Sequence, residues 1–174
     1  MAISRRDGLI LAGVGAVAAA AGALAGVFAL QARTGAAELL STTFRDLEGR
    51  PRRLLEWRGT ALLCNFWATW CAPCREEVPL LVAAKAAAAG NGLEIVGIGI
   101  DSAAKIREFS ETYKINYSLL VADATAVDLI RALGNRGGGL PYTVGLDRSG
   151  AVVERHLGAL KSPELRQLVA RLRS

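Results

Sequence analysis

The chain has 174 residues, with 21 Lys and Arg against 16 Asp and Glu, which gives a formal net charge of +5. Residues 34–174 carry only +3 of this charge, with no basic stripe interleaved with aromatic side chains, so no nucleic-acid partner is expected. A hydrophobic content of 52% and a charged content of 21% exclude general disorder. Three cysteines are too few for a disulfide-stapled mini-protein, and one histidine leaves little for a His-rich metal site.

The N-terminal segment predicts a membrane span. Residues 8–32 form an uncharged run of 25 residues, preceded by Arg5 and Arg6 and closed by Arg33. At about 1.5 Å per helical residue, this run is long enough to cross a hydrocarbon core of about 30 Å. The arginine pair places the N-terminus in the cytoplasm and the rest of the chain outside it. We therefore divide the chain into an N-terminal signal or membrane anchor (1–33) and one folded domain (34–174).

The fate of this segment stays open at the level of sequence. The run from Ser4 to Leu9 resembles a twin-arginine export signal, with Gly8 where such signals usually carry Phe. The length of the apolar run favours an uncleaved single-pass anchor. Cleavage would instead yield an exported soluble protein.

Apolar runs and turn signals predict alternating strands and helices along the domain. A turn at 46–49 indicates a short hairpin, and residues 61–67 indicate a strand buried on both faces. We then expect a helix over 74–89 that Pro79 interrupts and Gly90 ends, and a strand over 93–100.

The second half of the domain continues the alternation. Ser102 is expected to cap a helix, and a short strand (118–121) and a short helix (124–133) follow. A terminal hairpin (142–146 and 151–157) precedes a last helix that Ser162 caps. This order predicts an α/β sandwich around a mixed β-sheet.

The chemistry is indicated by a Cys-x-x-Cys motif, Cys71-Ala72-Pro73-Cys74, which follows a buried strand and opens a helix. The helix N-terminus stabilises a thiolate on Cys71, which is expected to point to solvent, while Cys74 is better shielded. Cys71 would attack a disulfide, and Cys74 would then resolve the mixed disulfide. The alternative, a zinc site, would need Cys64 and His156 as its remaining ligands, because no second Cys-x-x-Cys exists. We interpret Cys64 as a buried core thiol and His156 as a half-exposed strand residue.

Residues 65–79 read NFWATWCAPCREEVP. This string resembles the active site of thioredoxin-like proteins, and more narrowly that of the TlpA/ResA/CcmG-type membrane-anchored thiol:disulfide oxidoreductases of bacteria. The resemblance covers most of residues 38–174 and implies a thioredoxin fold. In that family a proline preceded by a cis peptide bond faces the dithiol, and Pro141 after Leu140 matches it.

The resemblance also assigns roles around the dithiol. Asn65 stands where thioredoxins proper carry a buried Asp, so Glu77 is implied as the proton acceptor, although a solvated helix residue is an equal alternative. A carboxylate there would raise the thiol pKa values by repulsion of the thiolate. Trp70, Leu140 and Pro141 are expected to bind the substrate, since a cis X-Pro bond lets the backbone of Leu140 pair with an extended client segment. An ordinary strand-initiating proline is the alternative for Pro141.

The predicted function is a protein-disulfide reductase that faces the periplasm from the bacterial inner membrane and needs no cofactor. A strongly oxidising dithiol requires that its thiolate be stabilised, and neither residue between the two cysteines here does so. By resemblance, its clients would be disulfide-containing proteins such as apocytochrome c or copper-site proteins, and a DsbD/CcdA-like membrane carrier would supply electrons. The alternatives are a disulfide-introducing oxidase, a peroxidase, and a copper-delivery module, which the Cys-x-x-Cys spacing disfavours and His156 keeps open.

Overall fold

The computed structural model describes residues 19–23, 26, 35–88 and 92–173. Seven strands form one sheet: β1 (Thr43–Asp46), β2 (Pro51–Arg53), β3 (Ala61–Trp67), β4 (Leu93–Ile100), β5 (Ser118–Ala122), β6 (Tyr142–Leu146) and β7 (Val152–Leu157). The helices are η1 (Leu54–Trp57), α2 (Ala72–Ala87), α3 (Ala103–Tyr113), α4 (Ala126–Ala132) and α5 (Ser162–Arg173), and residues 35–41 are also helical.

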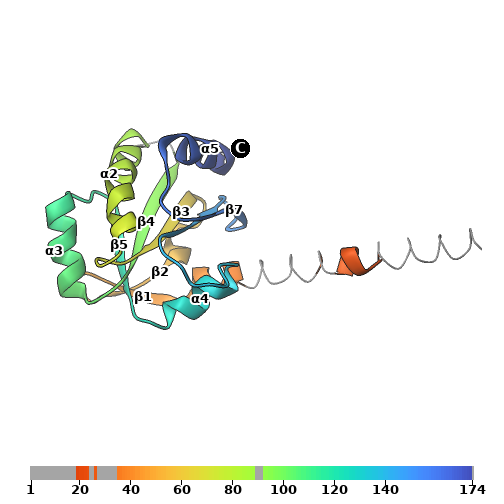
Figure 1. Cartoon of the computed structure of the whole chain (residues 1–174), viewed down its shortest axis with the longest axis horizontal. Coiled ribbons are helices and arrows are strands. Elements are labelled where there is room, and N and C mark those ends of the chain that lie inside the picture. Colours follow the sequence, from red (N-terminus) through yellow and green to blue (C-terminus); the bar gives the residue numbers. More distant parts are fainter. Residues whose placement is uncertain (1–18, 24–25, 27–34, 89–91, 174) are drawn as a thin grey trace, which may run out of the picture.

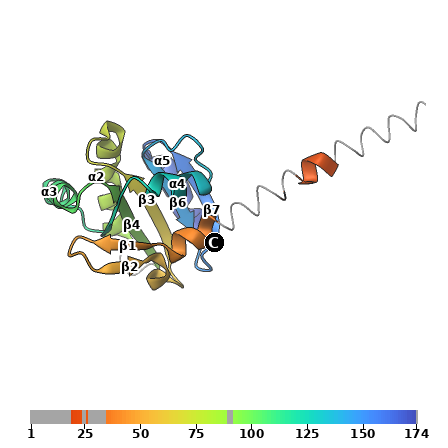
Figure 2. The ribbon, with the colours of Figure 1, turned by 90° about the horizontal axis from the view of Figure 1, so that it is seen from below.

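The sheet is mixed, with strand order β2-β1-β5-β4-β3-β6-β7. Its centre is parallel, since β4 lies between β3 and β5 and runs parallel to both. The two outer hairpins, β1–β2 and β6–β7, are antiparallel and lie at opposite edges (Figure 2). The predicted α/β sandwich is therefore confirmed, as is a thioredoxin-like fold, on the likeness to solved structures given below.

Helices cover both faces of the sheet (Figure 1). One core contains residues of α2, α3 and α5, and the other contains residues of α4 and of the helix at 35–41. Because both faces are covered, all seven residues of β3 are buried, as expected for a central strand in a parallel arrangement. The active-site segment follows directly from this rigid strand.

The boundaries of three helices differ from the sequence predictions, and one of these, α4 (Ala126–Ala132), is only shorter than the expected 124–133. α2 begins at Ala72 and continues through Pro79, which is exposed. Gly90, its expected end, lies outside the described residues. Ser162 is the first helical residue of α5 rather than its cap. The capping position belongs to Lys161, whose backbone N–H donates to Glu164 Oε2 (2.7 Å).

The predicted anchor (1–33) lies almost entirely outside the described residues, which include only 19–23 and 26 of it, all helical. No helix in the described part of the chain is long and apolar enough to cross a membrane. The helix at 35–41 belongs to the folded unit, since Ala36 and Leu39 are buried in the core that α4 shares.

Candidate active site

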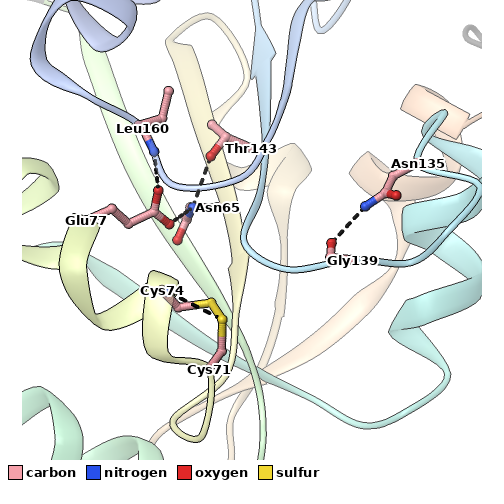
Figure 3. Close-up of a disulfide and its surroundings, with 8 residues drawn as sticks. All are labelled: Asn65, Cys71, Cys74, Glu77, Asn135, Gly139, Thr143 and Leu160. Atoms are coloured by element: carbon pink, nitrogen blue, oxygen red, sulfur yellow. Dashed lines mark hydrogen bonds between the residues drawn. A yellow bond between two sulfur atoms is a disulfide. The ribbon is translucent and has the colours of Figure 1, made fainter.

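Cys71 and Cys74 form a disulfide at the start of α2, with their Cα atoms 5.3 Å apart (Figure 3). Cys71 is the N-cap residue of this helix, and its Sγ accepts a hydrogen bond from the backbone N–H of Cys74 (3.3 Å). The helix N-terminus therefore points its positive end at Cys71. This placement matches the predicted dithiol between a buried strand and a helix.

The exposures of the two cysteines are ordered as predicted, but both are low. Cys74 is fully buried, and Cys71 retains only 6% of its accessible surface. The expectation that Cys71 points to solvent is therefore wrong for the disulfide form, because both sulfur-bearing side chains pack into the core on the α2 face. The adjacent Trp70 is instead the most exposed large apolar residue described, at 66%.

Glu77 lies one helical turn after Cys74 and is buried, with 1% of its surface exposed. Its Oε1 accepts a hydrogen bond from Asn65 Nδ2 (2.8 Å), and its Oε2 accepts one from the backbone N–H of Leu160 (2.9 Å) (Figure 3). Asn65 Nδ2 also donates to Thr143 Oγ1 (3.0 Å). The reading of Glu77 as a solvated helix residue is therefore wrong.

Burial raises the pKa of Glu77 to about 7, although the hydrogen bonds from Leu160 and Asn65 work in the opposite direction. Removal from water disfavours the charged carboxylate, and two neutral donors offset only part of that cost. Near neutral pH the group is therefore populated in both protonation states. A carboxyl with that property, one turn from a cysteine, is suited to accept or return a proton.

The segment that leads into β6 holds the predicted cis peptide bond, between Leu140 and Pro141. The backbone oxygen of Pro141 accepts a hydrogen bond from the N–H of Gly158 (2.9 Å), which joins this loop to the end of β7. Buried Asn135 donates from Nδ2 to the backbone oxygen of Gly139 (2.8 Å) and fixes the approach to the cis bond (Figure 3).

The sequence predictions missed three groups that support the site: Thr143, Asn135 and the backbone N–H of Leu160. Thr143 had a usable signal, because it lies two residues after Pro141 on a strand that was predicted correctly. No local signal indicates that Leu160, 83 positions after Glu77, supplies a donor to that carboxylate. The contact arises only when the end of β7 turns toward α2.

An open groove of about 910 Å³ has Trp70, the residue before Cys71, in its lining. The ends of β4 and β5 line it through Ile100 and Val121, and Phe44 of β1 contributes to its floor. Its ionisable lining includes Asp101 and Asp123. A surface of this size next to an exposed tryptophan offers room for an extended polypeptide segment.

Residues 34–156, well over half of the chain, match the AhpC/TSA family. The chain belongs to the AhpC/TSA family. It is 29% identical over 123 residues to the thiol-disulfide oxidoreductase ResA of Geobacillus thermodenitrificans, covering 70% of this chain and 68% of that protein. It is 30% identical over 129 residues to the thioredoxin-like protein YneN of Bacillus subtilis, covering 72% of each.

Among solved structures, a thioredoxin-family thiol:disulfide interchange protein from Chlorobium tepidum superposes with a TM-score of 0.65 at 28% identity, covering 76% of this chain and 93% of that one. Together with the Cys71–Cys74 pair, these likenesses show that this AhpC/TSA-family member is a thiol-disulfide oxidoreductase.

The third cysteine and the single histidine of this family member lie apart from that chemistry. Cys64 is free and fully buried in β3, and burial strongly raises the pKa of its thiol, so it packs as an apolar core residue. His156 is half-buried on β7, with its Nε2 3.9 Å from Glu164 Oε2. Within the described ranges, no group of three or more His, Cys, Asp or Glu side chains is placed to hold a metal ion.

Proposed function

We propose that this AhpC/TSA-family member is a protein-disulfide reductase whose dithiol is Cys71 and Cys74, with Glu77 as its internal base. The observation that carries the proposal is the buried Glu77 carboxyl one turn after Cys74, with its pKa raised to about 7. The Cys71 thiolate attacks one sulfur of the client disulfide and expels the other client sulfur as a thiolate, which takes a proton from water. This step leaves a mixed disulfide between Cys71 and the client.

Glu77 acts in the second half of the reaction. Its carboxylate takes the proton of the Cys74 thiol, and the resulting thiolate attacks Cys71 Sγ. The bond between Cys71 and the client breaks, and the client leaves as a second thiolate that is protonated by solvent. Two electrons have then passed to the client, and the disulfide between Cys71 and Cys74 is the oxidised product.

The surroundings of the dithiol favour a reducing potential. A strongly oxidising dithiol requires a thiolate that its protein stabilises. Here Cys71 Sγ accepts a hydrogen bond from the backbone N–H of Cys74 and lies at the N-terminus of α2. Ala72 and Pro73, between the two cysteines, carry no positive charge. A negative Glu77 disfavours a thiolate on its neighbour Cys74, which raises the pKa of that thiol and favours the transfer of electrons to the client.

Client proteins would bind across Trp70, Leu140 and Pro141. Trp70 offers an exposed aromatic surface, and the cis bond after Leu140 presents the backbone of that residue to an extended client segment. Asn65 holds Glu77 in place from the sheet. The proposed clients are apocytochrome c or copper-site proteins that must be kept reduced.

The proposed setting is the bacterial periplasm, with residues 1–33 as an inner-membrane anchor or a cleaved export signal and residues 34–174 as the exported domain. The uncharged run after Arg5 and Arg6 supports this orientation. A DsbD/CcdA-like membrane carrier would return the pair to its dithiol form after each turnover. The name of the Geobacillus relative, a thiol-disulfide oxidoreductase, supports the reaction class.

The reduction potential of Cys71–Cys74 tests the direction of the reaction. The full-length chain is equilibrated with glutathione and dithiothreitol redox buffers, and the fraction of dithiol is measured by thiol alkylation. A potential at or below about −220 mV, in the range of glutaredoxins and thioredoxin, supports the reductase. A value near −120 mV, typical of a strong oxidant, would overturn it in favour of a disulfide-introducing oxidase.

A further inference from the structure

Two buried polar atoms stand out within the part of the chain that the structure describes. Trp67 Nε1 and the Tyr117 hydroxyl have no hydrogen-bond partner in the protein, although Trp67 retains 1% and Tyr117 7% of its accessible surface. A buried donor left without a partner is destabilising. Such groups are normally satisfied by the protein or by an ordered water molecule.

The two rings that carry these atoms converge over the same point of the sheet. A Cβ placed on Gly97 would lie 2.8 Å from Leu119 Cδ2, 2.9 Å from Trp67 Nε1 and 3.0 Å from Tyr117 Cε2. Gly97, which has no side chain, therefore allows the indole and the phenol to converge above β4. Both rings belong to the core on the α2 face of the sheet, which also contains Cys74.

The same point adjoins the Glu77 site. Gly97 is paired in register with Asn65 on the neighbouring strand β3, and Asn65 donates directly to Glu77. Neighbouring strands lie about 4.8 Å apart, so the point where the two rings converge lies beside Asn65, which holds the Glu77 carboxyl on the α2 face of the sheet. In agreement, the negative charge of Glu77 contributes to raising the pKa of Tyr117, after burial as the larger cause.

We propose that Trp67 and Tyr117 hold one buried water molecule that donates a hydrogen bond to the carboxyl of Glu77. The water accepts from Trp67 N–H and exchanges a hydrogen bond with the Tyr117 hydroxyl, which makes about three bonds with the carboxyl as its third partner. Trp67 and Tyr117 are then positioning residues. They act on the reaction through the proton affinity of Glu77.

This site gives the carboxylate a third donor besides Asn65 and Leu160. A donor to the charged form stabilises that form, so the water lowers the proton affinity of Glu77 from the value that burial alone would set. Of the other groups that face Glu77, Asn65 and Thr143 are neutral and Leu160 contributes a backbone N–H. Burial and the hydrogen bonds from Leu160 and Asn65 are the causes of the Glu77 pKa shift, and Tyr117 is a titratable neighbour coupled to it.

The test is a direct titration of Glu77 in the oxidised full-length protein, in which Cys71 and Cys74 do not titrate. The side-chain carboxyl carbon of Glu77 is followed by ¹³C NMR from pH 4 to 9. Tyr117→Phe removes the hydroxyl and keeps the ring, and we expect the Glu77 midpoint to rise by about half a unit or more. Tyr113→Phe, on the half-buried tyrosine that stacks on Phe109, is the matched control and should leave the midpoint unchanged.

An unchanged or lowered midpoint in Tyr117→Phe would overturn the water site. A high-resolution crystal structure of the unaltered protein gives a second, independent readout. A water within hydrogen-bond distance of Trp67 Nε1, Tyr117 and Glu77 supports the site, and a protein atom in that position overturns it.

The inference deepens the proposed function, but its failure is separable. A fully active Glu77→Gln enzyme would refute the proposed base and leave the water site intact. If the Glu77 titration midpoint does not rise in Tyr117→Phe, the water site alone is refuted.

Discussion

Replacing Glu77 with glutamine should change the pH dependence of stability in a defined window. Burial raises the pKa of Glu77 in the folded protein from its ordinary 4.5 to about 7. The folded state therefore binds this proton more tightly than the unfolded state does. The stabilisation from the protonated carboxyl is complete below pH 4.5 and is lost as the pH rises through about 7.

The size of the effect follows from the shift. At 1.36 kcal/mol for each pKa unit, the rise from 4.5 to about 7 corresponds to about 3 kcal/mol of folding free energy lost between acid and mildly alkaline pH. The Glu77→Gln protein should keep this folding free energy as the pH rises, because the glutamine amide is neutral at every pH and resembles the protonated carboxyl in shape. The pKa values of Asp46, Asp101 and Asp147 are lowered in the folded protein. The stabilisation from these carboxylates is lost only at more acid pH, and equally in the unaltered protein and in Glu77→Gln.

The assay is urea denaturation of the oxidised proteins at pH 5, 7 and 8.5. The free energy of unfolding of Glu77→Gln minus that of the unaltered protein should grow by about 3 kcal/mol across this window. Glu76→Gln, on the exposed neighbour, is the control and should run parallel to the unaltered protein. Parallel profiles for the unaltered protein and Glu77→Gln would refute the reasoning, since they would mean that Glu77 ionises normally.

Two further predictions concern the reaction itself. In the proposed mechanism, Cys74→Ser should accumulate a mixed disulfide between Cys71 and its client, visible on a non-reducing gel, whereas Cys71→Ser should form none. The roles would be reversed if the adduct appeared only in Cys71→Ser. Trp70→Ala should raise KM for a protein disulfide about fivefold or more, as expected for an exposed aromatic anchor, with little change for glutathione disulfide. Leu55→Ala, at 39% exposure, is its control, and equal effects of the two substitutions would count against client docking at Trp70.

Local patterns were sufficient for most of the fold. The nearly continuous apolar run at 61–67, which only Asn65 interrupts, correctly predicted a strand buried on both faces, because such runs are typical of strands that helices cover on both sides. The turn chemistry at 147–150 likewise predicted the β6–β7 hairpin. The start of α5 was missed because Ser162 is a favourable cap in general. Here Glu164 instead accepts a hydrogen bond from the backbone N–H of Lys161, the residue before Ser162.

The site was predictable in its sulfur chemistry but not in its electrostatics. A Cys-x-x-Cys after a buried strand determines the disulfide at the start of α2, because the strand and helix fix its geometry. Whether Glu77 is solvated depends on Leu160 and on the packing of α5, which are distant in sequence. Helical spacing alone puts Glu77 one turn from Cys74, but it does not decide whether the carboxyl is buried or solvated. Long-range contacts decide which one the chain adopts.

The burial of Glu77 links the stability of the enzyme to its proposed mechanism. A solvent-exposed glutamate would ionise near pH 4.5 and would be a weak base toward a thiol of ordinary pKa. Moving it into the core costs about 3 kcal/mol at neutral pH and brings its pKa to about 7, close to the working pH of a general base. Asn65, Leu160 and the proposed water then limit the shift, because each donates to the charged form. Removing any one donor should therefore raise the pKa of Glu77 further and move the useful pH range of the enzyme upward.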